Sequence, residues 1–390
     1  MSSDDERRVL VLNAGSSSLK FALFCGSKRR YHGQVEGIGT RPRFLFADDS
    51  NAEDLPSATR HAAALGRILS ALQQRGVRIA DLGACGHRLV HAGAFFVAPT
   101  RVDTQQLAAI NQLRELAPLH NGPGLDAIEA MRAAAPSLPQ IACFDTAFHA
   151  TVPEVESRYA LPAELDAAGY RRFGFHGLNF EHVTATLSQR LGSSATARLL
   201  IFHLGNGCSV CAVKDGRSVG TTMGYSTLDG LVMGTRCGSI DPGVLLALQK
   251  RRGMSPDEIE ALLYRGSGLL AVSGVSSDMR ELERVDNDAC RFAIEHFCYW
   301  AARHAGSLAV TLGGVDSMAF TGGIGSGSAR VRARIIARLH WLGVELDENL
   351  NARNAGTISA SSSRCPVWVV AADEERAILR HVQDLLANSP

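Results

Sequence analysis

Five residues capable of chemistry stand in short polar stretches flanked by glycines, prolines or aromatic residues. They are Arg88 in HRLVHAG, His120 in LAPLHNGPG, Asp145 in ACFDTAFH, His176 in RFGFHG and Arg236 in MGTRCGSIDP. A single loop histidine is more often structural than catalytic. Together, two arginines, two histidines and an aspartate can clamp a carboxylate and stabilise the charge of a transferring phosphoryl group.

Three glycine-rich turns, each after an apolar run, indicate where a phosphate would bind. They are NAGSSSLK at residues 13–20, HLGNG at 203–207 and FTGGIGSG at 320–327. Glycines let backbone N–H groups approach an anion, and serine hydroxyls add donors. None matches the GxxxxGK[ST] pattern, so a P-loop is not indicated. The first turn taken alone is equally compatible with a plain β-hairpin.

The elements that must position these residues are of mixed type. Strand-like runs cover 9–12, 20–24, 140–144, 199–203, 209–213, 318–321 and 367–370. Apolar residues at helical spacing fill 104–116, which Pro118 ends, and 328–342; His120 is then expected in a Pro/Gly loop. The alternation predicts an α/β protein.

An internal echo suggests two domains of related architecture. The strand–turn–strand at 9–24 is repeated at 199–219, about half the chain later. The resulting prediction is an N-terminal domain of residues 1–150, joined by a C-terminal helix at 375–390, and a C-terminal nucleotide-binding domain of residues 151–374. A cleft between the two domains would receive the glycine-rich turns.

Composition narrows the function class. The 390 residues carry a formal net charge of +1, which leaves no basic surplus for a nucleic acid partner. The longest apolar segment, 292–312, contains charged residues, so no membrane span is expected. Nine cysteines without a regular spacing, and no export signal, predict reduced thiols in the cytoplasm. The lone CxxC at 208–211 lacks further ligands for zinc.

With these motifs set out, the chain resembles the acetate kinase family, including its propionate and butyrate kinase relatives. LNAGSSSLK, LAPLHN, FDTAFH, GFHG, HLGNG, MGTR and FTGGIG follow one another in the family's order, from Val9 nearly to the C-terminus. The resemblance implies two duplicated RNase-H-like domains of the actin-like ATPase fold and a homodimer. It also implies reversible, Mg²⁺-dependent transfer of the ATP γ-phosphoryl group to a short carboxylate, with Mn²⁺ able to substitute and ADP as the second product.

The resemblance carries over roles position by position. Asn13 and Glu374 match the magnesium site, Arg88 the carboxylate clamp, and Asp145, His176 and Arg236 the catalytic positions. His120, with Val90, Leu119 and Phe175, belongs to the substrate pocket, where a two- to four-carbon acid fits. The nucleotide set comprises Ser16, Ser18, Lys20, His203, Leu204, Gly205, Asn206, Gly207, Asp278, Met279, Arg280, Gly323, Ile324, Gly325, Ser326 and Gly327.

Asp145 has a second interpretation from chemistry alone. A carboxylate substrate is already ionised at neutral pH, since its unperturbed pKa is about 4. A general base is therefore not required, and Asp145 can instead orient Arg88 or Arg236.

Departures from the family's motifs lie beside the charged positions, which are all retained. GFHGTSH reads GFHGLNF here, which brings in Leu178, Asn179 and Phe180. The others are Ala92, Gly122, Gly124, Ser239, Met279, Ser326 and Gly327. We interpret them as a shift in nucleotide or acyl preference in an active enzyme. Acetate kinase is the favoured function; propionate or butyrate kinase, a weakly active nucleotide-binding regulator, and a phosphatase or NTPase remain alternatives.

Overall fold

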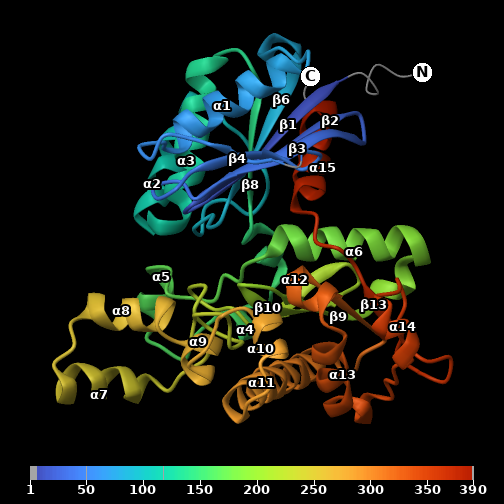
Figure 1. Cartoon of the computed structure of the whole chain (residues 1–390). Helices are drawn as coiled ribbons and strands as arrows, with labels where there is room; N and C mark the ends of the chain where they lie inside the picture. The colour runs from blue at the N-terminus through green and yellow to red at the C-terminus, as the bar shows by residue number, and fades with distance from the viewer. Residues whose placement is uncertain (1–6, 50, 117, 389–390) are drawn as a thin grey trace. The chain divides into compact units, whose positions relative to one another are not determined.

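The computed structural model describes residues 7–49, 51–116 and 118–388, with the side chains of 115–120 left aside. The chain divides into two compact units, Met1–Ala147 with Asp373–Pro390, and Phe148–Ala372 (Figure 1). The expected division assigned Glu374 to the C-terminal unit. The structure corrects this, because the helix that Glu374 begins packs on the N-terminal sheet.

The N-terminal unit is built on an eight-stranded sheet of order β5-β4-β3-β2-β1-β6-β8-β7. Strands β1 to β3 form antiparallel hairpins, whereas β1, β6 and β8 run parallel. The strands are β1 (Arg8–Gly15), β2 (Ser18–Cys25), β3 (Lys28–Glu36), β4 (Arg43–Phe46), β5 (Glu53–Asp54), β6 (Leu82–Leu89), β7 (Thr100–Arg101) and β8 (Gln140–Phe144).

Helices cover both faces of this sheet because its central strands are apolar on both sides. In β6, Cys85 joins the core under α1 and α3, while a side chain at the next residue, Gly86, would collide with Ile378 and Val382 of α15. The helices of this unit are α1 (His61–Gln74), α2 (Thr104–Leu116), α3 (Pro118–Ala134) and α15 (Glu374–Ala387) (Figure 1). The alternation along β6 therefore separates two cores.

The C-terminal unit repeats the same topology with five strands, in the order β11-β10-β9-β12-β13. The first three again pair antiparallel, and β9, β12 and β13 run parallel. The strands are β9 (Arg198–Leu204), β10 (Cys208–Lys214), β11 (Arg217–Thr221), β12 (Ser317–Thr321) and β13 (Val367–Val369). This order matches β3-β2-β1-β6-β8, so the predicted α/β class and its duplication are confirmed.

Helices α6 and α11 lie on opposite faces of the second sheet (Figure 1). The helices of this unit are α4 (Glu154–Ser157), α5 (Ala163–Ala167), α6 (Gly177–Leu191), α7 (Pro242–Arg252), α8 (Pro256–Arg265), α9 (Gly268–Ser273), α10 (Met279–Arg284), α11 (Asp288–Leu312), α12 (Gly322–Gly327), α13 (Ala329–Arg338) and α14 (Glu348–Ala352). Alternate residues of β9, including Leu199 and Ile201, pack against Phe180 and Val183 of α6.

Most of the predicted elements are confirmed, with three corrections. The expected loop around His120 is the start of α3, because Pro118 occupies the first helical position, where no N–H bond is needed. The glycine-rich turn near Gly323 is itself the short helix α12. The helix expected over 328–342 ends at Arg338 and a 3₁₀ turn follows. Within the described residues, no helix is long and apolar enough to cross a membrane.

Candidate active site

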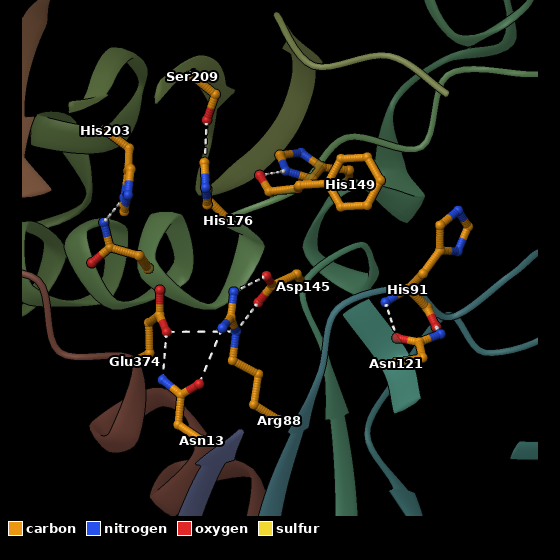
Figure 2. A network of polar contacts seen from close by, with 12 residues as sticks. Asn13, Arg88, His91, Asn121, Asp145, His149, His176, His203, Ser209 and Glu374 are labelled. Atoms are coloured by element: carbon orange, nitrogen blue, oxygen red, sulfur yellow. Dashed lines mark hydrogen bonds and ion pairs between the residues drawn. The ribbon is translucent and has the colours of Figure 1, made fainter. Parts of the chain in front are cut away.

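Four of the predicted residues form one hydrogen-bonded network in the N-terminal unit (Figure 2). Asn13 and Arg88 stand opposite each other in the parallel register of β1 and β6. Asp145 directly follows β8, the next strand of the sheet, and Glu374 is the first residue of α15. The carboxyl ends of three neighbouring parallel strands and one helix start therefore converge.

Arg88 is the centre of this network. Its Nε and Nη2 donate to the two carboxylate oxygens of Asp145 at 3.0 and 2.5 Å, and its Nη1 donates to Asn13 Oδ1 at 3.0 Å. Asn13 Nδ2 donates to Glu374 Oε2 at 2.9 Å, and Arg88 Nε lies 3.5 Å from the same oxygen. One edge of the guanidinium is thus locked by a bidentate ion pair.

The charges in this network are matched. Burial acts to lower the pKa of Arg88, but the carboxylates of Asp145 and Glu374 outweigh it, so the pKa of Arg88 is raised above its ordinary value. The Asp145 side chain is only 1% exposed. A buried carboxylate at this depth requires its arginine partner, because an unpaired buried charge is costly.

Gly124 of α3 lets the helix approach the strand that carries Arg88. A Cβ at this position would lie 2.9 Å from the Arg88 carbonyl oxygen and 2.5 Å from Leu89 Cδ2. Such contacts are too short for any side chain, so a glycine is required for this close packing. Gly124, one of the departures from the family's motifs, therefore serves helix–strand packing.

His176 occupies a strained backbone position in the C-terminal unit. Its φ of 59° and ψ of 20° are left-handed, which is uncommon for a residue other than glycine. Its Nδ1 lies 2.8 Å from Ser209 Oγ, and its ring stacks on His203 with centroids 4.1 Å apart (Figure 2). His149 supports the preceding residue, since its Nε2 lies 3.0 Å from the Phe175 carbonyl oxygen. Strain of this kind is concentrated at functional sites.

Arg236 and His176 meet above Gly207. A Cβ at Gly207 would lie 3.0 Å from His176 Nε2 and 3.2 Å from Arg236 Nη2, so a larger residue would push these two side chains from their places. Arg236 Nη1 donates to the Thr227 carbonyl oxygen at 2.8 Å. Burial lowers the pKa of Arg236, and the groups that act against burial are Cys208 and Tyr264 rather than a carboxylate. This cation is therefore well placed to attract an anion.

A pocket of about 430 Å³ in the C-terminal unit contains much of the predicted nucleotide set. Its predicted lining residues are Gly205, Asn206, Asp278, Met279, Arg280, Gly323, Ile324 and Gly327, and Ser277, Glu283 and Ser328 add to them. His203, Leu204, Gly207, Gly325 and Ser326 were predicted too but do not line it. A pocket of this size, with Gly205, Gly323 and Gly327 in its lining, suits a nucleoside.

The remaining predicted residues lie apart from these clusters. Ser16 and Lys20 are exposed at and after the β1–β2 turn, and Ser18 begins β2. Val90 is buried in the N-terminal unit and Phe175 in the C-terminal one. The side chains of Leu119 and His120 lie outside the described residues.

Sequence reasoning missed Arg332, which supports the end of α12, the short helix that contributes Gly323, Ile324 and Gly327 to the pocket. The side chain is fully buried, and its Nη1 donates to the carbonyl oxygens of Gly325 and Ser326 at the end of α12. Its other nitrogens donate to Asn351 and Asn354. The available signal was an arginine flanked by Val331 and Ile335 on the apolar face of a helix.

Acid is expected to weaken the fold through buried histidines, of which His87 is a clear case. Burial, only partly offset by Gln140, lowers the pKa of His87 from 6.5 to about 4. Between these two pKa values the unfolded chain binds a proton at His87 that the folded chain does not. The contribution of neutral His87 to the free energy of unfolding is therefore fully present above pH 6.5 and is lost as the pH falls towards 4. The loss amounts to about 3 kcal/mol.

Urea unfolding of the wild type and of His87→Met between pH 7 and pH 4.5 measures the pH-dependent contribution of His87 to the free energy of unfolding. His149 titrates in the same direction, while Glu156 and Glu375, whose pKa values burial raises, act oppositely. Those groups are common to both proteins, so the difference isolates His87. The free energy of unfolding of the variant is expected to rise relative to that of the wild type as the pH falls. A difference that does not change with pH would contradict the lowered pKa of His87.

This chain is similar to known proteins over nearly its whole length. The model of the Acetokinase family matches residues 8–380. An acetate kinase from Nitrobacter hamburgensis is 45% identical over 97% of this chain and 96% of its own length. A propionate kinase structure from Francisella tularensis superposes with a TM-score of 0.91 at 35% identity, covering 97% of this chain and 99% of that one. An acetate kinase structure from Porphyromonas gingivalis gives 0.90 at 34% identity, covering 97% and 100%.

Proposed function

Because this chain belongs to the acetokinase family, we propose that it reversibly transfers the γ-phosphoryl group of ATP to acetate. A carboxylate oxygen of acetate attacks the γ-phosphorus, the bond from that phosphorus to the β–γ bridging oxygen breaks, and ADP leaves with acetyl phosphate as the other product. The observation that carries the proposal is the pair of arginines in contrasting environments. Arg88 is matched by carboxylates, whereas Arg236 is partly buried without that compensation.

Arg88 binds the substrate carboxylate in this proposal, and Asp145 orients it. The Nε–Nη2 edge of the guanidinium is held by Asp145, so the substrate meets the edge formed by Nη1 and Nη2. A planar guanidinium locked on one side presents its other donors in a fixed direction, which lowers the entropy lost when the substrate binds. Asp145 is then a positioning residue and transfers no proton.

His176 and Arg236 stabilise the transferring phosphoryl group. Charge spreads over its equatorial oxygens as the bonds to the attacking and leaving oxygens change, and donors that are already in place stabilise that charge without reorganisation. His176 Nε2 and Arg236 Nη2 both border the side-chain-free face of Gly207. The left-handed backbone at His176 and its Ser209 contact hold the imidazole in this orientation.

Asn13 and Glu374 are the proposed holders of Mg²⁺. Their oxygens are the hard donors that Mg²⁺ prefers, and a site with few protein ligands suits an ion that keeps waters and substrate phosphates. Asn13 Oδ1 accepts a hydrogen bond from Arg88, so Glu374 offers the more available oxygens. The ion would supply neutralising charge to the nucleotide phosphates. The described residues contain no cluster of three or more His, Cys, Asp or Glu side chains able to hold a metal.

The nucleotide occupies the pocket of about 430 Å³ in this proposal. Met279 is buried beside it at the start of α10, and Glu283 accepts a hydrogen bond from Ser328 Oγ at 2.6 Å within its wall. Arg280 is paired with Asp278 in the same short segment. Ser16, Ser18 and Lys20 are kept as phosphate contacts, and Val90, Leu119, His120 and Phe175 as contacts for the acyl substrate.

Acyl phosphate trapped as its hydroxamate tests the proposal directly. The full chain is incubated with ATP, Mg²⁺, hydroxylamine and formate, acetate, propionate or butyrate in parallel. Acetate is expected to give the highest kcat/KM; because one methylene in an apolar pocket is worth only about 1–3 kcal/mol, propionate is expected as the second-best acceptor. Hydrolysis of ATP with no hydroxamate from any acid would overturn the kinase assignment.

Free thiols support a reducing compartment as the site of action. None of the nine cysteines forms a disulfide in the described structure, and seven are buried: Cys85, Cys143, Cys208, Cys211, Cys290, Cys298 and Cys365. Disulfides are rare where thioredoxin and glutathione keep thiols reduced. We therefore place the enzyme in the cytoplasm in this proposal.

We further propose a homodimer that forms through the exposed face of α11. Six positions on that face are spaced 4, 3, 4, 3 and 4 residues apart, which is the spacing of a coiled-coil seam. This seam consists of Phe292, His296, Tyr299, Arg303, Gly306 and Val310. Phe292, Tyr299 and Val310 are each more than half exposed, which is unusual for a row of apolar side chains.

The order of residues along the seam is complementary to its own reverse. In a two-fold pair of antiparallel helices, positions equally far from the crossing point face each other. Crossing midway between Tyr299 and Arg303 would set Phe292 against Val310, Tyr299 against the Arg303 guanidinium, and His296 above Gly306. The first pair makes an apolar contact and the second a cation–π contact. In the third, the glycine leaves room for the imidazole ring.

Light scattering coupled to size-exclusion chromatography measures the oligomeric state. The double substitution Tyr299→Glu with Val310→Glu is expected to convert a dimer into a monomer, because four carboxylates would enter the paired seams. Val155→Glu is the matched control, since Val155 is 91% exposed on α4. A double variant that remains dimeric would show that another surface makes the interface.

A further inference from the structure

Three side chains form a row across neighbouring strands of the C-terminal sheet. Ser209 of β10, His203 of β9 and Thr321 of β12 are direct partners in the strand registers. Helix α6 begins above this row. His176 precedes the helix and meets Ser209, while Asn179 in its first turn meets His203 and Thr321. Asn179 thus connects two strands of the sheet.

The direction of the Asn179 contact follows from which of its atoms are satisfied. Its Nδ2 lies 2.7 Å from His203 Nδ1 and donates to Thr321 Oγ1 at 3.2 Å, so both amide hydrogens have acceptors. Asn179 is fully buried, and its Oδ1 has no hydrogen-bond partner among the described groups. Turning the amide over would leave two buried N–H groups unmet instead of one carbonyl oxygen, which is the costlier arrangement.

An amide nitrogen can only donate, so the nitrogen that faces it must accept. We propose that Asn179 is a positioning residue that holds His203 in its neutral form with the hydrogen on Nε2. The assignment of the tautomer rests on the geometry alone, and its value for turnover rests on the proposed phosphoryl transfer. A residue that fixes one ring nitrogen determines what the other can do.

The hydrogen on Nε2 points where a phosphoryl oxygen would be bound. The side-chain-free position at Gly205 lies 3.7 Å from the Gly323 backbone nitrogen and 4.0 Å from His203 Nε2; the nearest atom, the Gly207 carbonyl oxygen at 3.5 Å, already accepts a hydrogen bond from the Gly205 N–H. With Nε2 protonated, this position is bordered by two donors. In the opposite tautomer, Nε2 would present a lone pair towards the same position and would repel a phosphate.

A neutral His203 also decides the charge of the stacked pair. The rings of His176 and His203 lie 4.1 Å apart and within 13° of parallel. Two imidazolium ions at this distance would repel each other, with Arg236 as a third cation near the Nε2 of His176. Phe180 adds an apolar edge against His203, which disfavours a charge on that ring. His176 is therefore left as the ring that can carry a proton towards phosphate.

Long-range ¹H–¹⁵N NMR of the full chain labelled with ¹⁵N-histidine reports the tautomer directly. His203→Gln identifies the His203 signals among those of the thirteen histidines. The wild type is expected to show His203 Nδ1 as an unprotonated ring nitrogen and Nε2 as a protonated one at pH 7. A protonated Nδ1 in the wild type would overturn the proposal, whatever the behaviour of any variant.

Variants at Asn179 test the cause. Asn179→Asp is expected to place the hydrogen on Nδ1, to raise the pKa of His203 by pairing, and to lower kcat by about 10- to 100-fold with little change in the KM for acetate. Asn179→Ser retains a donor and is expected to recover more activity than Asn179→Ala. Thr184→Ala is the control for general disturbance of the helix. It removes a different buried polar group of α6, the Thr184 hydroxyl, which donates a hydrogen bond to the Phe180 carbonyl oxygen.

The role of Asn179 and the kinase activity are tested by different outcomes. An Asn179→Asp protein that folds, by its unchanged histidine signals elsewhere, but keeps the wild-type tautomer and kcat would overturn the role of Asn179. Absence of acyl phosphate from the wild type would overturn the kinase proposal and leave the tautomer measurement standing.

Discussion

Arg88→Met is expected to lower kcat/KM for acetate by about three orders of magnitude and to destabilise the protein by about 3 kcal/mol. The catalytic loss follows from removing the donors of a carboxylate clamp, since even a single preorganised donor is worth about 10²- to 10³-fold. The loss of stability has a separate cause. The Asp145 carboxylate, 1% exposed, would be left in the interior without its bidentate partner. The hydroxamate assay and urea unfolding measure the two effects.

A second substitution separates these effects. Arg88→Met with Asp145→Leu is expected to recover most of the stability, because the stranded charge is gone, but none of the activity. Affinity for ADP is expected to stay within a few-fold of the wild type in both variants, since the pocket is lined by residues 205–328 alone. Loss of ADP binding on replacing Arg88 would show that this arginine serves the nucleotide and not the carboxylate.

Arg236→Met is expected to reduce kcat by about the factor expected for Arg88→Met. Its effect on stability is expected to have the opposite sign. Burial lowers the pKa of Arg236, and no carboxylate is among the groups that counter it. Replacing such a cation by an apolar side chain of similar length is expected to leave the free energy of unfolding unchanged or raise it by about 1 kcal/mol. Calorimetric unfolding and single-turnover phosphoryl transfer test the two parts.

Anion binding provides the control for Arg236. ADP with phosphate is expected to raise the Tm of the wild type, because a ligand that binds only the folded state stabilises it. The phosphate-dependent part of that increase is expected to be absent in Arg236→Met and partly present in Arg236→Lys, which retains charge but not the planar fork. If Arg236→Met proves as destabilising as Arg88→Met, Arg236 has a structural ion-pair role instead.

The strands and the family could be predicted from sequence because their signals are local. Buried strands such as β1, β8 and β12 are continuous apolar runs, and the glycine-rich motifs lie directly after them. A prediction failed where two local signals competed. Pro118, Gly122 and Pro123 read as a loop, but the segment forms α3, because Pro118 fits the first turn and Gly124 allows close packing on β6.

Hydrogen-bond partners, in contrast, depend on strand register and on where distant elements dock. Glu374 is separated from Asn13 by 361 residues, and the two meet only because α15 packs on the sheet that contains β1. Asn179 read from sequence as a departure from a motif; its contact with His203 requires α6 to lie over β9 and β12. The same holds for Arg332, whose acceptors come from two other segments.

The sequence by itself therefore determined the residue types available for phosphoryl transfer and the α/β elements that carry them. Only the tertiary structure decided their electrostatic states: that Arg88 is compensated by Asp145 and Glu374, and that Arg236 is not. The reason is that pKa, tautomer and donor direction depend on distances of a few ångströms between groups far apart in the chain, which residue spacing does not encode.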